Sequence, residues 1–283
     1  MRSRVTPARR HRPRPDAVPA PASPRKPLRL LVEERRRRIL ELLDEQERVT
    51  VEELSARFHV SAVTIRGDLE ALSASGALVR SHGGALRQLD QPDAPIAVKE
   101  TLHHGEKVRI GHAAAQLIRQ DETIILDSGT TTVEIARQIK FLQLRSLTVI
   151  TNALNIAMEL ANLPHVRVIM IGGLLRQMSY STVGPHAEQI LRALNADKLF
   201  LGVDGLDPAI GLTTPDVLEA QLNALMIKVS REVIAVADSS KFLRRSLSLI
   251  AGVNHVHRLI TDHKADPQVI ASLRAMNIDV MVV

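Results

Sequence analysis

Residues 123–139 read TIILDSGTTTVEIARQI, and this stretch decides the fold of most of the chain. An apolar run at 123–126 precedes a turn of Gly and hydroxyl residues, DSGTTT at 127–132, and a helical pattern follows the turn. A buried strand that passes directly into a helix is typical of sheets whose strands run parallel. The turn also suits an anion, because backbone N–H groups and the positive end of a helix can hold a phosphate.

The same alternation continues to the end of the sequence. Further apolar runs lie near residues 147–151, 166–171, 198–203, 232–237, 257–261 and 279–283. Helical patterns separate most of them, at residues 132–142, 153–163, 186–194, 217–229 and 267–276. This arrangement predicts an α/β domain over residues 107–283, with a doubly wound, mainly parallel sheet covered by helices on both faces.

Small polar residues follow several of the predicted strands. Ligands of open parallel sheets bind outside the carboxyl ends of the strands, so these residues are expected to meet in one crevice. The Gly and hydroxyl residues can donate to a phosphate, Lys241 adds a positive charge, and the carboxylates can accept from hydroxyl groups. The predicted ligand is therefore a small phosphorylated polyol or sugar. The predicted ligand-binding residues are Asp127, Ser128, Gly129, Thr130, Thr131, Thr132, Thr151, Asn152, Gly172, Gly173, Arg176, Asp204 and Lys241.

Each of these residues also has an ordinary structural interpretation. Asp127 and Asp204 are of the type that caps the turn after a strand. The pair at 172–173 suits tight backbone geometry, which glycine permits. Arg176 could belong to a solvated loop, and Lys241 could be a surface lysine. A location at the carboxyl end of the sheet is what would separate the two interpretations.

Residues 31–88 show a different pattern, of helices followed by a hairpin. Thr50 and Glu53 form a capping box at the start of a short second helix, which places Val51, Leu54 and Phe58 inward. Ser61 caps a third helix, in which Ile65, Leu69 and Leu72 share one face. The runs 77–80 and 85–87 flank a Gly turn and predict a strand pair. The segment is therefore predicted to be a winged helix-turn-helix domain.

In such a domain the second helix of the motif enters the major groove of DNA. The residues expected to reach base edges or phosphates are Ser61, Ala62, Thr64 and Arg66 of the third helix and Arg80, His82 and Arg87 of the wing. The alternative is a three-helix interaction module that binds no DNA. Four Arg residues against two acids within 54–88 favour DNA, although the domain as a whole is slightly acidic.

Composition divides the rest of the chain. Residues 1–30 hold nine of the 37 Lys and Arg residues and one of the 31 acids, so they are predicted to be a disordered basic leader. Residues 89–106 contain Pro92 and Pro95 and are predicted to be a linker. The chain has no Cys, which is compatible with a reducing compartment, and no apolar run long enough for a membrane span. Together with the predicted DNA-binding domain, this leads to the expectation of a cytoplasmic, nucleoid-associated protein without membrane partners. No metal site is predicted.

The sequence resembles the DeoR/GlpR family of bacterial transcription regulators in both halves. The N-terminal motifs are R-x-x-I-L-x-L-L, V-T-V-E-E-L, V-S-x-x-T-I-R-x-D-L and G-x-L-x-R-x-H-G-G-A, within residues 35–86. The later motifs are DSGTTT, TN, GG-x-x-R-x-x-S-x-STVGP, GVDGLD, GLTTPD-x-x-EA-x-LN and ADSSKF. One departure is Gly67, where the family often has a basic or polar residue.

This resemblance implies a repressor of a sugar-catabolism operon that binds operator DNA as a homo-oligomer, a dimer or a tetramer. It implies a sugar-phosphate effector, no cofactor and no catalytic residues. The GLTTPD and EAQLN segments resemble the branch that controls amino-sugar operons, such as those for N-acetylgalactosamine.

The resemblance also keeps an enzyme in view, because the family's effector domain is similar in fold to ribose-5-phosphate isomerases and glucosamine-6-phosphate deaminases. Isomerisation of a sugar phosphate needs a positioned acid and base. The isomerases carry a G-A-D-E-type strand end, and the matching stretch here, 202–205, has Gly205 in place of the second carboxylate. A regulator is therefore favoured over a sugar-phosphate isomerase or deaminase with an accessory domain.

Overall fold

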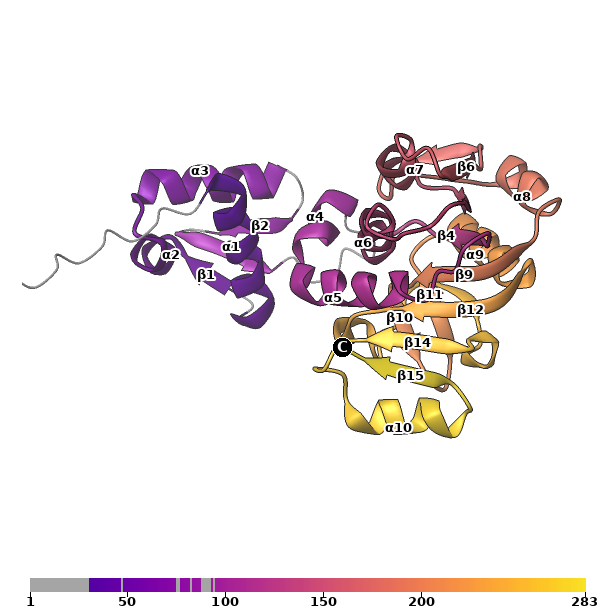
Figure 1. Ribbon diagram of the computed structural model, residues 1–283. Helices are drawn as coiled ribbons and strands as arrows, with labels where there is room; N and C mark the ends of the chain where they lie inside the picture. The colour runs from indigo at the N-terminus through magenta and orange to yellow at the C-terminus, as the bar shows by residue number, and fades with distance from the viewer. Residues whose placement is uncertain (1–30, 47, 75–76, 82, 88–92, 94) are drawn as a thin grey trace, which may run out of the picture.

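The computed structural model describes residues 31–46, 48–74, 77–81, 83–87, 93 and 95–283 (Figure 1). The predicted basic leader, residues 1–30, and the wing residue His82 lie outside the described residues. In the described part of the chain, no helix is long and apolar enough to cross a membrane.

The N-terminal domain, termed the head, has three helices and a small sheet. Its elements are α1 (Val32–Gln46), β1 (Arg48–Thr50), α2 (Val51–Phe58), α3 (Ala62–Ala74), β2 (Leu78–Ser81) and β3 (Gly84–Arg87). The predicted capping box is present, since the Glu53 N–H donates to Thr50 Oγ1 at 3.2 Å and the Thr50 N–H donates to Glu53 Oε2 at 3.0 Å. The predicted apolar faces of α2 and α3 are buried in the core of the head.

The wing of the head has one more strand than expected. Strands β2 and β3 form the predicted hairpin, and β1 pairs with β3, which gives the strand order β1-β3-β2. Gly84 is required at this contact, because a Cβ atom there would lie 2.1 Å from the Val49 carbonyl oxygen. The short strand β1 therefore fixes the wing against the start of α2.

The C-terminal α/β domain is built on a seven-stranded sheet whose strand pairs are all parallel. The order is β15-β14-β12-β9-β4-β5-β6. The seven predicted strands are confirmed as β4 (Thr123–Leu126), β5 (Leu147–Thr151), β6 (Val166–Met170), β9 (Ala196–Gly202), β12 (Ser230–Val236), β14 (Arg258–Thr261) and β15 (Asp279–Val282).

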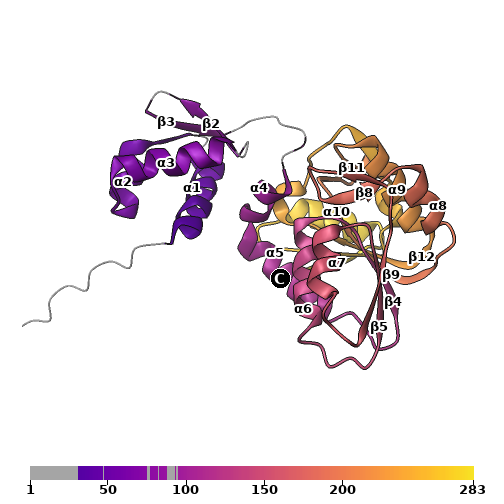
Figure 2. The ribbon, with the colours of Figure 1, turned by 90° about the horizontal axis from the view of Figure 1, so that it is seen from above.

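Helices cover both faces of this sheet (Figure 2). Alternate residues of each strand enter two separate apolar layers; in β4, Ile124 belongs to one and Ile125 to the other. The first layer contains residues of α5 (His104–Ala115), α6 (Thr130–Ile139) and α7 (Leu154–Leu160). The second contains residues of α8 (Pro185–Leu191), α9 (Val217–Lys228) and α10 (Pro267–Ala275). The predicted doubly wound fold is confirmed.

Smaller elements surround the carboxyl end of the sheet. Strands β7 (Leu174–Arg176) and β8 (Ser181–Val183) form a hairpin. Strands β10 (Gly205–Asp207), β11 (Gly211–Thr214) and β13 (Ser248–Ala251) form an antiparallel sheet. The short 3-10 helix η1 (Ser239–Lys241) follows the end of β12, and a second one, η2 (Val253–His255), precedes the start of β14.

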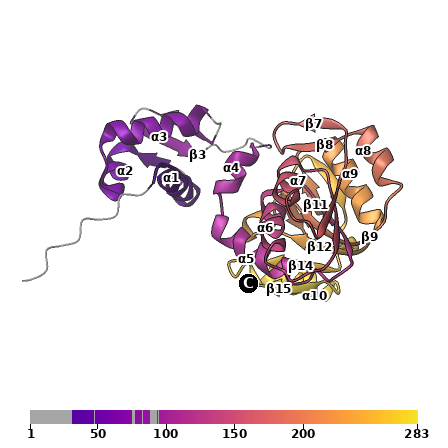
Figure 3. The same ribbon diagram turned by 45° about the horizontal axis from the view of Figure 1, so that its top comes forward.

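The range 89–106, predicted to be a linker, contains helix α4 (Ile96–Thr101) and the start of α5. Figure 3 shows α4 between the head and the α/β domain. Its six residues are too few for a clear apolar period, and Pro95 precedes it, which explains why the sequence pattern did not indicate a helix.

The strand order fixes the location of the site. From β4 the chain moves outward through β5 and β6, then returns to the other side of β4 as β9 and continues to β15. The turns that follow β4 and β9 therefore open in opposite directions and leave a crevice between them. The stretch DSGTTT follows β4 at this point.

Candidate functional site

A cleft lies at the crevice between the ends of β4 and β9. It holds about 550 Å³ of space, part of it open to solvent. Of the predicted ligand-binding residues, those that line it are Ser128, Gly129, Thr130, Thr131, Asp204 and Lys241. Residues that sequence reasoning did not assign to the site also line it: Ile96, Lys99, Met178, Ser179, Gly202, Val203, Thr214 and Glu219.

The start of α6 forms one wall of the cleft. Gly129 is the N-cap residue, and within the described residues no side chain caps this helix. The first-turn amides of a helix have no partner inside the helix, so they are available to an anion. The Asp127 carboxyl group fixes the position of Ser128, because the Ser128 N–H donates to Asp127 Oδ1 at 2.6 Å. The wall therefore offers backbone donors from Gly129 onward and the hydroxyls of Thr130 and Thr131.

The opposite wall carries two lysines and one carboxylate. Lys99 Nζ of α4 lies 2.8 Å from Asp204 Oδ1, and Thr214 Oγ1 lies 3.4 Å from Asp204 Oδ2. Burial alone would raise the pKa of Asp204, but Lys99 and Lys241 outweigh it and hold the pKa below its ordinary value. Asp204 is therefore ionised and held as a hydrogen-bond acceptor beside the cleft.

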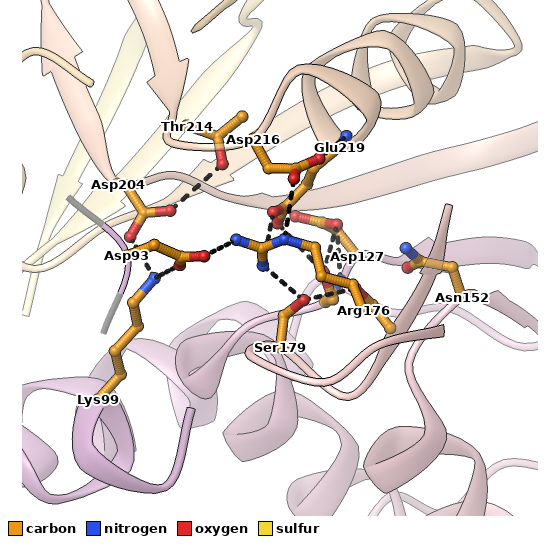
Figure 4. A network of polar contacts seen from close by, with 12 residues as sticks. Asp93, Lys99, Asp127, Asn152, Arg176, Ser179, Asp204, Thr214, Asp216 and Glu219 are labelled. Carbon is orange, nitrogen blue, oxygen red and sulfur yellow. Dashed lines mark hydrogen bonds and ion pairs between the residues drawn. The ribbon is translucent and has the colours of Figure 1, made fainter. Parts of the chain in front are cut away.

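Arg176 lies at the back of the site in a network of carboxylates (Figure 4). Its guanidinium pairs with Glu219 at 3.1 Å, with Asp216 at 3.3 Å and, at short range, with Asp93. It also donates to Ser179 Oγ at 2.7 Å. Ser179 and Ser181 are buried and their hydroxyls lie 2.6 Å apart, so this segment is not the solvated loop that was the alternative interpretation.

Two acids beneath the cleft have strongly altered ionisation. Burial raises the pKa of Glu219 to about 7, against the attraction of Arg176. Burial and the neighbouring Glu219 raise the pKa of Asp127 well above its ordinary value. Ser128 Oγ lies between them, 3.5 Å from Asp127 Oδ1 and 3.4 Å from Glu219 Oε1. Near neutral pH, Glu219 is therefore close to its midpoint of ionisation, and burial favours the protonated form of Asp127 more than in an ordinary aspartate.

The other predicted ligand-binding residues do not line the cleft, and the structure gives most of them a local role. Thr132 donates to the Gly129 carbonyl at 2.9 Å, and Thr151 Oγ1 accepts from the Ala153 amide. Asn152 is fully buried and donates to the Thr182 carbonyl at 3.1 Å. A Cβ atom at Gly173 would lie 2.6 Å from the Val183 carbonyl oxygen, whereas a Cβ at Gly172, which precedes β7, would meet nothing within 4 Å. Asp127 Oδ1 accepts from the Ser128 amide and so stabilises the turn after β4, as the alternative interpretation expected.

A second carboxylate of the isomerase type has no room in this fold. Gly205 begins β10, and a Cβ atom there would lie 2.3 Å from the Arg244 carbonyl oxygen and 2.5 Å from Thr213 Oγ1. Contacts this short exclude any side chain unless the backbone moves. The position therefore cannot supply an acid or a base.

The head presents the start of α3 to solvent. Ser61 Oγ accepts from the Thr64 amide at 3.2 Å and lies 2.9 Å from Thr64 Oγ1, which confirms Ser61 as the cap. Ser61 and Arg66 are exposed, while Ala62 and Thr64 are partly exposed. Val63, which sequence reasoning did not select, is 74% exposed beside them. A solvent-facing valine on this turn was not indicated by the apolar period, which reports only the buried face.

Arg80 is the one predicted DNA-binding residue of the wing whose side chain the structure describes, and it is less free than expected. Arg80 Nη1 donates to the Arg66 carbonyl at 3.1 Å and lies 3.5 Å from Glu70, so this side chain is directed toward α3. The side chain of Arg87 lies outside the described residues. A buried contact that the sequence did not reveal joins α3 to α1: Asp68 pairs with Arg35 at 2.5 Å and with Arg36 at 3.2 Å.

A winged helix-turn-helix head joined to an α/β domain with a polar cleft defines a ligand-responsive DNA-binding regulator of transcription. Residues 35–90 match the model of the DeoR-like helix-turn-helix domain, and residues 102–263 match that of the DeoR C terminal sensor domain. The chain belongs to the DeoR family of transcription regulators. This confirms the predicted class, and the enzyme alternative is not favoured.

Curated relatives agree with this assignment. A protein of Escherichia coli O157:H7, named as a candidate repressor of the aga operon, is 38% identical over 88% of this chain and 93% of its own length. Transcriptional repressor AccR of Agrobacterium fabrum is 37% identical over 81% of this chain and 89% of its own. The glycerol-3-phosphate regulon repressor of Escherichia coli K12 is 32% identical over 79% and 88%.

Solved structures similar to the chain include ribose 5-phosphate isomerase A of Methanocaldococcus jannaschii, with 15% identity, a TM-score of 0.36, and coverage of 48% of this chain and 53% of that chain. The translation initiation factor eIF-2B of Pyrococcus horikoshii OT3 has 16% identity, a TM-score of 0.37, and coverage of 77% and 74%.

Proposed function

We propose that this regulator represses a sugar-catabolism operon and that a phosphorylated sugar, bound in the cleft, releases it from operator DNA. One observation carries the proposal: the uncapped start of α6 and the side chain of Lys241 line the same cleft. Backbone donors at a helix start and a lysine together are a recurring way of holding a phosphate.

The remainder of the cleft suits the hydroxyl groups of a sugar. Asp204 is an ionised acceptor, and Thr214 and Ser179 add hydroxyl groups that can donate or accept. Ile96 and Met178 provide apolar surface. A compact polyol with one phosphate matches this combination of one cationic end, several acceptors and a small apolar wall.

The relatives support a sugar effector without naming it. One relative is named for the aga operon and another for glycerol 3-phosphate. Because the GLTTPD and EAQLN segments resemble the amino-sugar branch, phosphorylated amino sugars are the first compounds to test. We further propose that the protein acts in the cytoplasm as a homo-oligomer, since a two-fold assembly matches a palindromic operator.

The cleft is tested by a thermal-shift screen of sugar phosphates, because a ligand that binds the native state raises its apparent stability. The compound that raises the melting temperature is then titrated into a gel-shift assay with DNA from the protein's own promoter region. Thr130→Ala and Lys241→Ala should retain DNA binding and need at least about tenfold more compound for release. Lys228→Ala, an exposed lysine at the end of α9, is the matched control. A normal response of Lys241→Ala would remove that lysine from the site.

The head is tested in the same gel shift without effector. Arg66→Ala should weaken binding by roughly tenfold or more, because an arginine on the groove-facing turn of α3 contacts guanine or phosphate. Arg38→Ala, an exposed arginine of α1, is the control and should bind as the wild type does. Equal binding by the Arg66 variant and the wild type would reject α3 as the recognition helix. Salt must be fixed throughout, since phosphate contacts depend on it.

A further inference from the structure

The carboxylate of Asp93 lies between two cations of the site (Figure 4). It pairs with Arg176 at short range, and Asp93 Oδ1 lies 3.7 Å from Lys99 Nζ. The other carboxylates labelled in Figure 4, Asp127, Asp204, Asp216 and Glu219, belong to the α/β domain. Asp93 instead comes from the segment that leads out of the head, two residues before Pro95 and the start of α4.

Helix α4 connects this carboxylate to the head. On one side, the Ile96 amide donates to the Met178 carbonyl at 2.7 Å and Lys99 pairs with Asp204, so α4 is attached to the cleft. On the other side, α4 shares a groove with α1 and α3 of the head, lined by Ala97, Val98, Thr101, Arg36, Leu40 and Leu72. A displacement of α4 from the cleft would therefore also move it against the head.

The end of α4 is fixed in the same way. Lys107 of α5 is buried and donates to the carbonyl oxygen of Leu102 at 2.6 Å and, at short range, to that of Lys99. These bonds attach the end of α4 to the α/β domain independently of the cleft ion pairs. Loss of the Asp93 contacts would thus weaken the attachment at the start of α4, where the Ile96 amide and the Lys99–Asp204 pair remain, while the end of α4 stays fixed, as a hinge requires.

The charges at this point favour exchange with an anion. Arg176 faces the carboxyl groups of Asp93, Asp216 and Glu219, and even with Glu219 protonated the two aspartates carry more negative charge than one guanidinium can balance. A phosphate beside them would be repelled unless one carboxylate left. Asp216 also accepts from the Glu219 amide at 2.9 Å as the cap of α9, so its position is fixed. The Glu219 side chain is buried, so Asp93 is the acid of the three that can leave without opening a helix cap or exposing a buried side chain.

We propose that the negative charge of Asp93 competes with the phosphate of the effector for the cationic surroundings of the cleft, so that effector binding displaces Asp93 from Arg176 and Lys99 and loosens α4 from the cleft. The inference rests on the proposed function and adds its regulation. The effector is an anion of the phosphate type. The head responds because the competing carboxylate, Asp93, belongs to the segment that joins the head to α4. The ligand needs no direct contact with the head, since it shifts the equilibrium through its preference for the displaced arrangement.

The test begins with anion binding alone, using the full chain, inorganic phosphate as the probe and isothermal titration calorimetry. Asp93→Asn removes the competing charge, so phosphate should bind about fivefold more tightly than to the wild type. Asp93→Glu keeps the charge and should bind phosphate as weakly as the wild type does. Glu100→Gln removes one negative charge from helix α4 at a position paired with Arg137, outside the cleft lining, and controls for general electrostatics.

The second measurement is binding to promoter DNA in the absence of effector. Asp93→Asn should bind about fivefold more weakly, while Asp93→Glu and Glu100→Gln should match the wild type. If Asp93→Asn binds phosphate no more tightly than the wild type does, the inference is overturned. Asp93 would then have only the structural role of attaching α4 to Arg176. Unchanged DNA affinity of Asp93→Asn would overturn the link to the head. Failure of all sugar phosphates to release the wild type from DNA would instead count against the proposed function. The two failures can be told apart because the phosphate titration involves no DNA.

Discussion

The head and the α/β domain each bury an ion network, and the two networks are opposites. In the head, one carboxylate, Asp68, is enclosed between α1 and α3 and pairs with the two guanidiniums of Arg35 and Arg36. In the α/β domain, one guanidinium, Arg176, pairs with three carboxylates beside an open cleft. The closed network can only hold helices together, whereas the open one can exchange a partner for a ligand.

The largest effect is expected from opening the closed network. Asp68→Ala leaves two arginines, one of them buried, without this carboxylate, and should lower the free energy of unfolding of the head by about 3 kcal/mol. Chemical denaturation followed by circular dichroism measures it. Glu70→Ala, two residues along the same helix, removes only an exposed pair and should cost under about 0.5 kcal/mol. A loss below about 1 kcal/mol for Asp68→Ala would show that the two networks do not differ as described.

The open network should instead reveal itself through pH. The pKa of Glu219 is about 7 in the folded chain against an ordinary 4.5, so the folded chain keeps a proton that the unfolded chain releases within this window. Stability from this group is therefore greatest at the acid end and is lost as pH rises through about 7. Glu219→Gln should remove roughly 2 kcal/mol of this dependence between pH 5 and 7.5. The measurement is the free energy of unfolding of both proteins, from thermal unfolding at a series of pH values. Equal pH dependence in the wild type and in Glu219→Gln would contradict this prediction.

A smaller effect should follow from stiffening α3 beside its closed network. A Cβ atom at Gly67 would meet nothing within 4 Å, so Gly67→Ala fits without strain. Alanine is favoured over glycine in a helix by about 1 kcal/mol, and the head should gain that much stability. The measurement is the melting temperature of the head. Release of the variant by sugar phosphate should be unchanged, and altered release would mean that the head and the cleft are not separable in this way.

The smallest effect is expected at Val63, which faces solvent on the first turn of α3. If this turn enters the major groove, the side chain is placed to contact a thymine methyl group. Val63→Ala should weaken promoter binding about threefold. DNA with uracil in place of the contacted thymine should weaken the wild type equally and should not weaken the variant further. If the losses in DNA affinity from Val63→Ala and from uracil simply add, Val63 does not contact that thymine methyl group.

Local patterns predicted most of the fold because local chemistry determines it. The capping box at Thr50 and the apolar faces of α2 and α3 follow from spacing alone. The sheet strands follow from apolar runs between helical patterns. Strand β1 was missed because three residues beside a helix cap carry no period of their own, and its pairing depends on Gly84, far along the chain.

The site was predicted less completely, for a physical reason. Small polar residues follow parallel strands both where ligands bind and where turns need them, so Thr151 and Asn152 could not be separated from Ser128 by type. The missed residues depend on long-range contacts. Lys99 meets Asp204 more than a hundred positions away, and no periodicity reports such a pair. A lysine directly after the short apolar sequence Ile96 to Val98 was the one available signal.

The crowding at Gly205 also bears on the history of this fold. The Arg244 carbonyl, part of the backbone, occupies the space that any side chain at position 205 would need. A single substitution therefore cannot install an acid there, because the segment around Arg244 would have to be rebuilt first. Mutational paths from this regulator to an enzyme that uses that position are blocked at the first step. The packing of one backbone carbonyl thus restricts what position 205 can become, independently of any effect on ligand binding.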